Sequence, residues 1–217
     1  MNQYLVDALS KDEQARLAAL DSPAKIQAYL DSLPYRAEEL DRSPLQVWRD
    51  GQCHCLDGAL FAAAALRRLG FPARVIDLVP EPGADDDHVL ALYQVDGLYG
   101  AVAKSNYPGL RFREPVHRTL RELALTYFEG YFNLENRKTL RAYTRPLDLA
   151  RFDRYAWETG QEGVRRVVAR LYALKPIPLI PPEAAARLTP LDERSLRANL
   201  VGVDLAESFG SRPDTGQ

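Results

Sequence analysis

The sequence predicts an α+β fold in which a buried, cysteine-bearing helix packs on a small antiparallel sheet. Three observations support this prediction. The run from Gly51 to Arg74 reads as an apolar helix with a clear end, residues 88–104 read as a β-hairpin, and extra helical patterns occur toward both ends of the chain. A length of 217 residues with 46% hydrophobic content is enough for one substantial core.

Helices are expected near residues 10–20 and 23–33, because Ser22 and Pro23 suit a helix cap and a first helical position. A third helix is expected to precede Trp48. The next helix is the central one. Its residues from 59 to 66 are apolar on every side, which is typical of a helix surrounded by protein.

The central helix is expected to begin near Cys55 and to stop at Gly70, which suits a left-handed cap, with Pro72 preventing continuation. Strands are expected to follow. The dipeptide at 96–97, Asp-Gly, favours a two-residue type I′ turn. With that turn, His88 would lie opposite Ser105. The β-branched and aromatic content places the strands at residues 73–79, 88–95 and 98–104.

Helical patterns return after the hairpin. One is expected from Pro115 to about Phe132 and another over residues 161–174. The proline-rich segment 175–183 cannot continue a helix, so it is expected to lie extended on the surface or to lead to a partner. Residues 1–183 are expected to form one domain and 184–217 a C-terminal extension, whose end, 210–217, is expected to be disordered.

Cys55 and His88 are the residues that suggest chemistry. A cysteine at the start of a helix meets unpaired N–H groups and the positive end of the helix dipole, which favour the nucleophilic thiolate. A histidine at a strand start is suitably placed to take the thiol proton, and the acidic run before it favours its protonated form. A buried cysteine that serves only as a small apolar residue is the alternative.

The pattern G-x-C-x-C-x-D-G-A followed by L-R-x-L-G-x-P-A-R, then D-H and a hairpin, resembles the transglutaminase-like superfamily of papain-like cysteine enzymes. The resemblance covers about residues 44–107, and it implies a papain-like core with Cys55, rather than Cys53, as nucleophile and His88 as its base. Residues 110–132 look like a feature of uncharacterised bacterial members. The family usually has an aspartate where this chain has Ala103.

The third catalytic residue is therefore open. Asn106 is favoured because an amide orients the imidazole in papain-like enzymes, with Ser105 and Asp87 as alternatives. The N–H of Cys55 and the side chain of Gln52 are candidate oxyanion donors. The resemblance then implies a cysteine hydrolase or acyltransferase that acts on amide bonds of a peptide or protein through an acyl-enzyme, with water or an amine as acceptor.

The alternative function is an inactive transglutaminase-like module that binds a peptide or protein partner. No metal or organic cofactor is expected. A zinc site at Cys53-His54-Cys55 would need ligands from His88, His117 or carboxylates, because the chain has two cysteines and three histidines. The closely spaced cysteines are expected to remain free thiols.

Charge and composition bound the partners and the location. A net charge of −2, a pI near 6.0 and the absence of a reader motif argue against nucleic acid, and the basic side chains after Arg111 alternate with acids as on a solvated helix. The N-terminal residues offer no apolar stretch for secretion or membrane insertion. With two unpaired cysteines, the chain is expected in the cytoplasm. The oligomeric state is not predicted.

Overall fold

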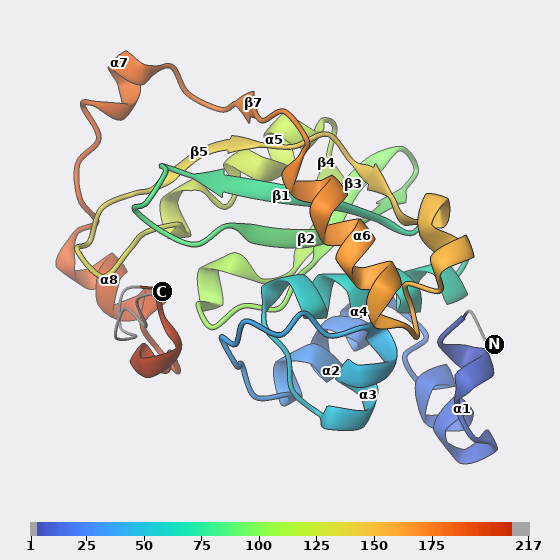
Figure 1. Cartoon of the computed structure of the whole chain (residues 1–217). Helices are drawn as coiled ribbons and strands as arrows, with labels where there is room; N and C mark the ends of the chain where they lie inside the picture. Colours follow the sequence, from blue (N-terminus) through green and yellow to red (C-terminus); the bar gives the residue numbers. More distant parts are fainter. Residues whose placement is uncertain (1–3, 210–217) are drawn as a thin grey trace.

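A computed structural model of the chain describes residues 4–209 and shows a mixed α+β architecture around one antiparallel sheet (Figure 1). The strand order is β4-β3-β2-β1-β5-β7, and β6 also pairs with β1. The predicted α+β class is therefore confirmed. The strands are β1 (Arg74–Pro80), β2 (His88–Val95), β3 (Leu98–Val102), β4 (Arg113–His117), β5 (Leu140–Tyr143), β6 (Leu147–Asp148) and β7 (Ile177–Pro178).

Helices cover both faces of the sheet (Figure 1). On one face α4 lies against the strands, with α2 and α3 beneath it and α6 alongside, whereas α5 covers the other face. The helices are α1 (Lys11–Ala18), α2 (Pro23–Ser32), α3 (Pro44–Asp50), α4 (Cys55–Arg68), α5 (Leu120–Leu125), α6 (Gln161–Tyr172), α7 (Pro182–Ala185) and α8 (Glu193–Asn199).

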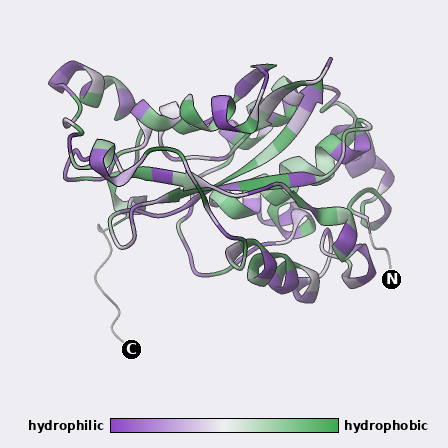
Figure 2. Ribbon diagram, turned by 90° about the horizontal axis from the view of Figure 1, so that it is seen from above, coloured by the Kyte–Doolittle hydropathy of each residue, from purple (hydrophilic) through white to green (hydrophobic). Residues whose placement is uncertain are grey.

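Alternation along the strands divides the apolar side chains between these two faces. In β2, Val89 and Ala91 pack with the residues of α4, whereas Leu90 and Leu92 pack with α5. The apolar side chains of β1 also divide between the two faces. Figure 2 shows the matching hydropathy, with hydrophobic colour concentrated in the sheet and hydrophilic turns on the outlying helices. Because both faces are covered, β2 is buried on both sides, and its sequence shows no polar alternation.

The central helix forms as the sequence predicts. It begins at Cys55, and Asp57 closes a capping box by accepting the backbone N–H of His54. Every residue from 56 to 66 is buried. The helix ends at Arg68, and Gly70 has a φ of 91°, a left-handed conformation that glycine adopts without strain.

The hairpin is confirmed in its turn and register, but it is shorter than predicted. Asp96 and Gly97 both have positive φ, as a type I′ turn requires, and Val95 pairs with Leu98. The pairing of β2 with β3 ends at Ala91 and Val102, so the expected pairing of His88 with Ser105 does not form. From residue 103 onward the chain leaves the sheet.

Four other expectations need correction in whole or in part, or remain open. The helix predicted from Pro115 to Phe132 is wrong: Pro115 lies in edge strand β4, and helix α5 starts only at Leu120, where Thr119 supplies the cap. The helix expected before Trp48 instead contains it. Segment 175–183 is extended at β7, as predicted, but then turns into α7. The disorder predicted for 210–217 lies outside the described residues.

The C-terminal extension returns to the body of the molecule. After α8, the chain forms a 3-10 turn at Leu205–Glu207 and runs against residues that follow β3 (Figure 1). Across residues 4–209, no helix combines the length and apolar character that a bilayer crossing demands.

Candidate functional site

Cys55 occupies the predicted position at the first residue of α4, and its sulfur lies beside the start of β2. Sγ is 3.8 Å from the carbonyl oxygen of Asp87, and the backbone N–H of Val89 is directed to the sulfur. The residue keeps some exposed surface, but its thiol group is enclosed by protein. The structure therefore places Cys55 at a helix start, as predicted, but in a closed setting.

The setting of Cys55 favours the protonated thiol. Burial raises its pKa well above the ordinary value, and the carboxyl groups of Asp87, Asp86 and Asp57 raise the pKa further, opposed by the Val89 N–H. A helix dipole contributes at most about 2 kcal/mol, whereas burying an unpaired charge costs more. Desolvation therefore outweighs the dipole, and Cys55 is a thiol at neutral pH.

The His88 ring lies on the face of the sheet that α5 covers. Its neighbour Val89 packs toward α4, so the His88 ring points to the α5 face, where it contacts the rings of Tyr127 and Tyr131. Nε2 of His88 donates to the Leu110 carbonyl oxygen at 2.7 Å. Burial lowers the pKa of His88 to about 4, so the ring is neutral at neutral pH.

The predicted catalytic pair is not hydrogen-bonded. Among the hydrogen bonds of residues 4–209, none joins Cys55 to His88: the sulfur lies at the Asp87 carbonyl oxygen, whereas His88 Nε2 donates to the Leu110 carbonyl oxygen. The acidic run does not favour a protonated imidazole, because desolvation dominates the His88 pKa. Ala103, at the family's usual aspartate position, is buried against the α5 side.

The candidates for the third residue also form other contacts. Asn106 Nδ2 donates to the carbonyl oxygen of Asp204 at 2.7 Å, and Asn106 Oδ1 accepts from the Asp204 N–H at 3.0 Å. Ser105 Oγ accepts the Tyr107 N–H at 3.0 Å. Gln52, the candidate oxyanion donor, is half-buried in the connection between α3 and α4.

Four of the predicted residues nevertheless share one small cleft of about 40 Å³, which Cys55 does not line. These residues are Asp87, His88, Ser105 and Asn106. The opposite wall is formed by residues 207–209 of the C-terminal extension. The four residues therefore lie close together, as the sequence predicts. The remaining lining of their cleft includes a peptide segment of the same chain and not the thiol of Cys55.

Polar contacts hold that segment in place. Besides the paired hydrogen bonds of Asn106, the Glu207 carboxylate accepts from Arg36 Nη1 at 3.1 Å and from the Ala37 N–H at 2.7 Å. Ser208 Oγ accepts from Tyr107 Oη at 2.9 Å. Sequence reasoning missed these contacts, since nothing local relates residues about 100 to 170 positions apart.

A carboxyl pair beside Cys55 was also missed. Asp77 faces Val89 across the β1–β2 pairing, and its carboxyl group lies near that of Asp87. Burial, followed by the charge of Asp87, raises the pKa of Asp77 to about 8. Two negative charges on buried carboxyl groups this close repel each other, so the pair favours keeping one proton. The sequence signal is an aspartate inside an otherwise apolar strand.

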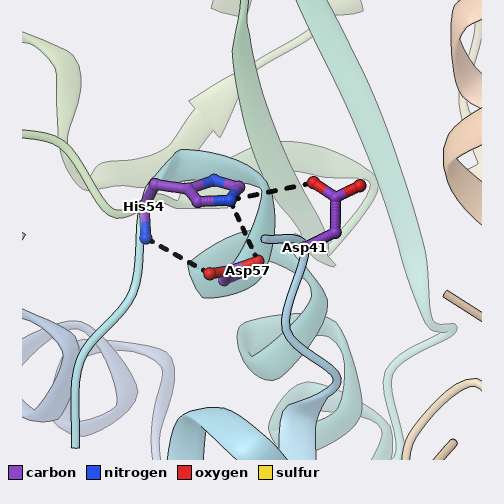
Figure 3. A group of neighbouring side chains, drawn as sticks. All are labelled: Asp41, His54 and Asp57. Carbon is purple, nitrogen blue, oxygen red and sulfur yellow. Dashed lines mark hydrogen bonds and ion pairs between the residues drawn. The ribbon is translucent and has the colours of Figure 1, made fainter. Parts of the chain in front are cut away.

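The residues suited to a metal ion are not the cysteines. Asp41, His54 and Asp57 bring three ligand atoms within 4.8 Å of one another, at the start of α4 (Figure 3). Of the tripeptide considered in the sequence, only His54 takes part. Cys53 is a buried free thiol, whose pKa burial raises to about 12.

Comparison with protein-family models and with curated proteins finds no match for this chain. The transglutaminase-like resemblance therefore remains a prediction from the residues quoted above.

Proposed function

We propose that this chain is a binding module for a peptide segment of a protein partner, built on a transglutaminase-like core whose cysteine and histidine are not paired for catalysis. One observation carries the proposal. The cleft lined by His88, Ser105 and Asn106 holds a peptide in cis, and Asn106 forms hydrogen bonds with both backbone groups of Asp204.

Asn106 bonds only the backbone N–H and carbonyl oxygen of Asp204, so these two hydrogen bonds do not depend on which side chain stands at that position. Selectivity comes from the next contacts along the segment. Arg36 and the Ala37 N–H bind a carboxylate three residues later, and Tyr107 binds a hydroxyl group four residues later. A partner segment with an acidic residue followed by serine or threonine would satisfy the same groups. The C-terminal extension then acts as an internal competitor at high effective concentration.

Binding in trans tests the proposal. In a chain that ends at Val203, with folding checked by circular dichroism, we expect saturable binding of a fluorescent peptide DLAESF by anisotropy. Asn106→Ala in that chain removes two hydrogen bonds of about 1 kcal/mol each, so affinity should fall about tenfold or more. Gln94→Ala is the matched control, because the Gln94 amide bonds the Gly97 carbonyl oxygen at the turn of the hairpin and does not line the cleft. Equal binding with and without Asn106 would contradict the proposal.

The cysteine hydrolase or acyltransferase is the second candidate. The observation that favours it is the position of Cys55 at the start of α4 with the Val89 N–H at its sulfur. For acyl transfer, however, a ring nitrogen of His88 would have to form a hydrogen bond with Cys55 Sγ, whereas Nε2 now donates to the Leu110 carbonyl oxygen. The substrate, the acyl acceptor and the cytoplasmic location remain predictions from the sequence.

Thiol reactivity separates the two candidates. In a Cys53→Ser background, we expect slow alkylation of Cys55 by iodoacetamide at neutral pH, rising only in alkaline solution, because burial and neighbouring carboxylates raise its thiol pKa. The rate should not change in His88→Ala. Mass spectrometry of the labelled peptide gives the rate. Fast labelling near neutral pH that is lost in His88→Ala would instead favour the enzyme.

A further inference from the structure

The His54 ring at the start of α4 faces three oxygen atoms at once (Figure 3). Its Nε2 lies 3.3 Å from the Leu40 carbonyl oxygen, 3.3 Å from Asp57 Oδ1 and 3.7 Å from Asp41 Oδ1. A single N–H donor bonds one oxygen best, typically near 2.9 Å. All three distances are longer than that, so the hydrogen bond to the Leu40 carbonyl oxygen is a long one and the two carboxylate oxygens lie almost as close to Nε2.

These distances match a different arrangement. In a tetrahedral zinc site with bonds of about 2.0–2.1 Å, neighbouring ligand atoms lie about 3.3–3.4 Å apart. Two of the three separations from Nε2 agree with that spacing, and the third is a few tenths of an ångström longer. One imidazole nitrogen, two carboxylate oxygens and one carbonyl oxygen would make four donors.

Charge around this group favours a cation. Arg42 pairs with Glu38 and Asp50, and its remaining nitrogen is 3.6 Å from Asp57 Oδ2. Together with Asp41, four carboxyl groups therefore lie around the single guanidinium group of Arg42. Asp57 Oδ1 accepts the Arg42 backbone N–H but keeps a lone pair on the side of His54.

Burial adds a second argument. The Asp57 side chain is fully buried and that of His54 is 11% exposed, whereas Asp41 is 32% exposed and borders solvent. A carboxylate buried this completely needs positive charge close to it. A bound cation would supply that charge, and Asp41 provides the side from which it would enter.

We propose that His54 Nε2, Asp41, Asp57 and the Leu40 carbonyl form a binding site for a divalent transition metal ion, best suited to Zn²⁺. An imidazole ligand selects Zn²⁺ over Ca²⁺ and Mg²⁺, which prefer oxygen-only sites. The ion would tie the loop that precedes α3 to the first turn of α4. The thiols of Cys53 and Cys55 are not ligands, and the proposal is independent of peptide binding.

Zinc titration of the full-length, chelator-treated chain tests the site, with a chromophoric chelator as competitor. We expect one Zn²⁺ per chain. His54→Gln and Asp41→Asn should each weaken binding at least about tenfold. Asp50→Asn is the matched control, because Asp50 pairs with Arg42 but does not face the ring; it should change affinity less than threefold.

Cobalt substitution identifies the ligands. We expect visible bands of tetrahedral Co²⁺ without the near-ultraviolet charge-transfer band of a thiolate, unchanged in Cys53→Ser and Cys55→Ser. Thermal unfolding of the metal-free variants verifies that they are folded, and Zn²⁺ should raise the midpoint of the unaltered chain but not of His54→Gln. No saturable zinc binding, retention of affinity in folded His54→Gln, or dependence on either cysteine would overturn the proposal.

Discussion

Asp77 and Asp87 show how two adjacent acids behave when the fold buries them together. Their carboxyl groups lie close together, and burial together with their mutual repulsion favours keeping one proton on the pair. Asp77 Oδ1 and Asp87 Oδ2 have no hydrogen-bond partner among the described residues, which adds to the cost of ionising both. The pair is thus a pH-dependent feature of the native state.

Asp77→Asn should flatten the pH dependence of stability. The pKa of Asp77 is about 8 in the folded state and about 3.9 in an unfolded chain, so the native state holds the extra proton and the free energy of unfolding falls as pH rises between these values. Asparagine cannot ionise and donates an N–H to Asp87. Urea denaturation measures the free energy of unfolding at about pH 5 and at about pH 8. We expect its decrease between these pH values to be about 1–3 kcal/mol smaller in the variant than in the unaltered chain.

Asp12→Asn, at an exposed position of α1, is the control and should leave the pH dependence unchanged. The same loss of stability with rising pH in Asp77→Asn as in the unaltered chain would show that the shared proton is not on this pair.

At the scale of elements, α4 and the segment after β3 touch at a glycine. A Cβ added at Gly58 would lie 2.3 Å from Cβ of Lys104 and 3.6 Å from Sγ of Cys53. Because Cβ of Lys104 is fixed by the backbone, no side-chain rotation relieves the contact. The close approach also lets Lys104 Nζ donate to the Leu30 and Leu33 carbonyl oxygens at the end of α2.

Gly58→Ala should therefore destabilise the protein by about 1–3 kcal/mol through overpacking, although alanine favours a helix by about 1 kcal/mol. Urea denaturation measures the effect. In a Lys104→Gly background, which is itself less stable because the Nζ bonds are lost, the same change should be neutral or stabilising. Additive effects in this double-mutant cycle would contradict the contact.

The elements differ in how well the sequence predicts them. α4 and the turn of the hairpin follow from local signals: a capping box, a positive-φ glycine and an Asp-Gly turn. The helix expected from Pro115 failed because its first residues pair with β3 as an edge strand. That pairing depends on a distant partner, so the local helical pattern was overridden.

At the scale of the whole molecule, the C-terminal segment contacts two distant parts of the chain. Asn106, which follows β3, binds Asp204, and Arg36 and Ala37, which precede α3, bind Glu207. These contacts are polar, and residues 204–206 and 209 are exposed, although Asn106 and Ser208 are buried; local opening of such a segment costs less than global unfolding. The segment is therefore suited to leave the cleft while the sheet stays folded.

Hydrogen exchange in the full chain should detect this opening. In Asn106→Ala, we expect the Ala37 amide, which donates to Glu207, to exchange several-fold faster because the segment is held less firmly. The amide of Ala91, in the centre of the sheet, should keep its rate, and the control Gln94→Ala, outside the cleft, should change neither amide. An unchanged Ala37 rate would mean that Asn106 does not hold the segment.

The sequence by itself determined the α+β class, the helix that begins at Cys55 and the turn at Asp96 and Gly97, because each depends on interactions within a few residues. It also placed His88, Asp87, Ser105 and Asn106 close together, since all lie at one end of the hairpin. Only the tertiary structure decided that His88 faces α5. β2 is buried on both sides, so its residues carry no polar alternation to mark a face, and one step along a strand reverses a side chain. The meeting of Asn106 with Asp204, of Asp77 with Asp87, and of Asp41 with His54 was likewise decided by long-range packing, which brings together residues that no local pattern relates.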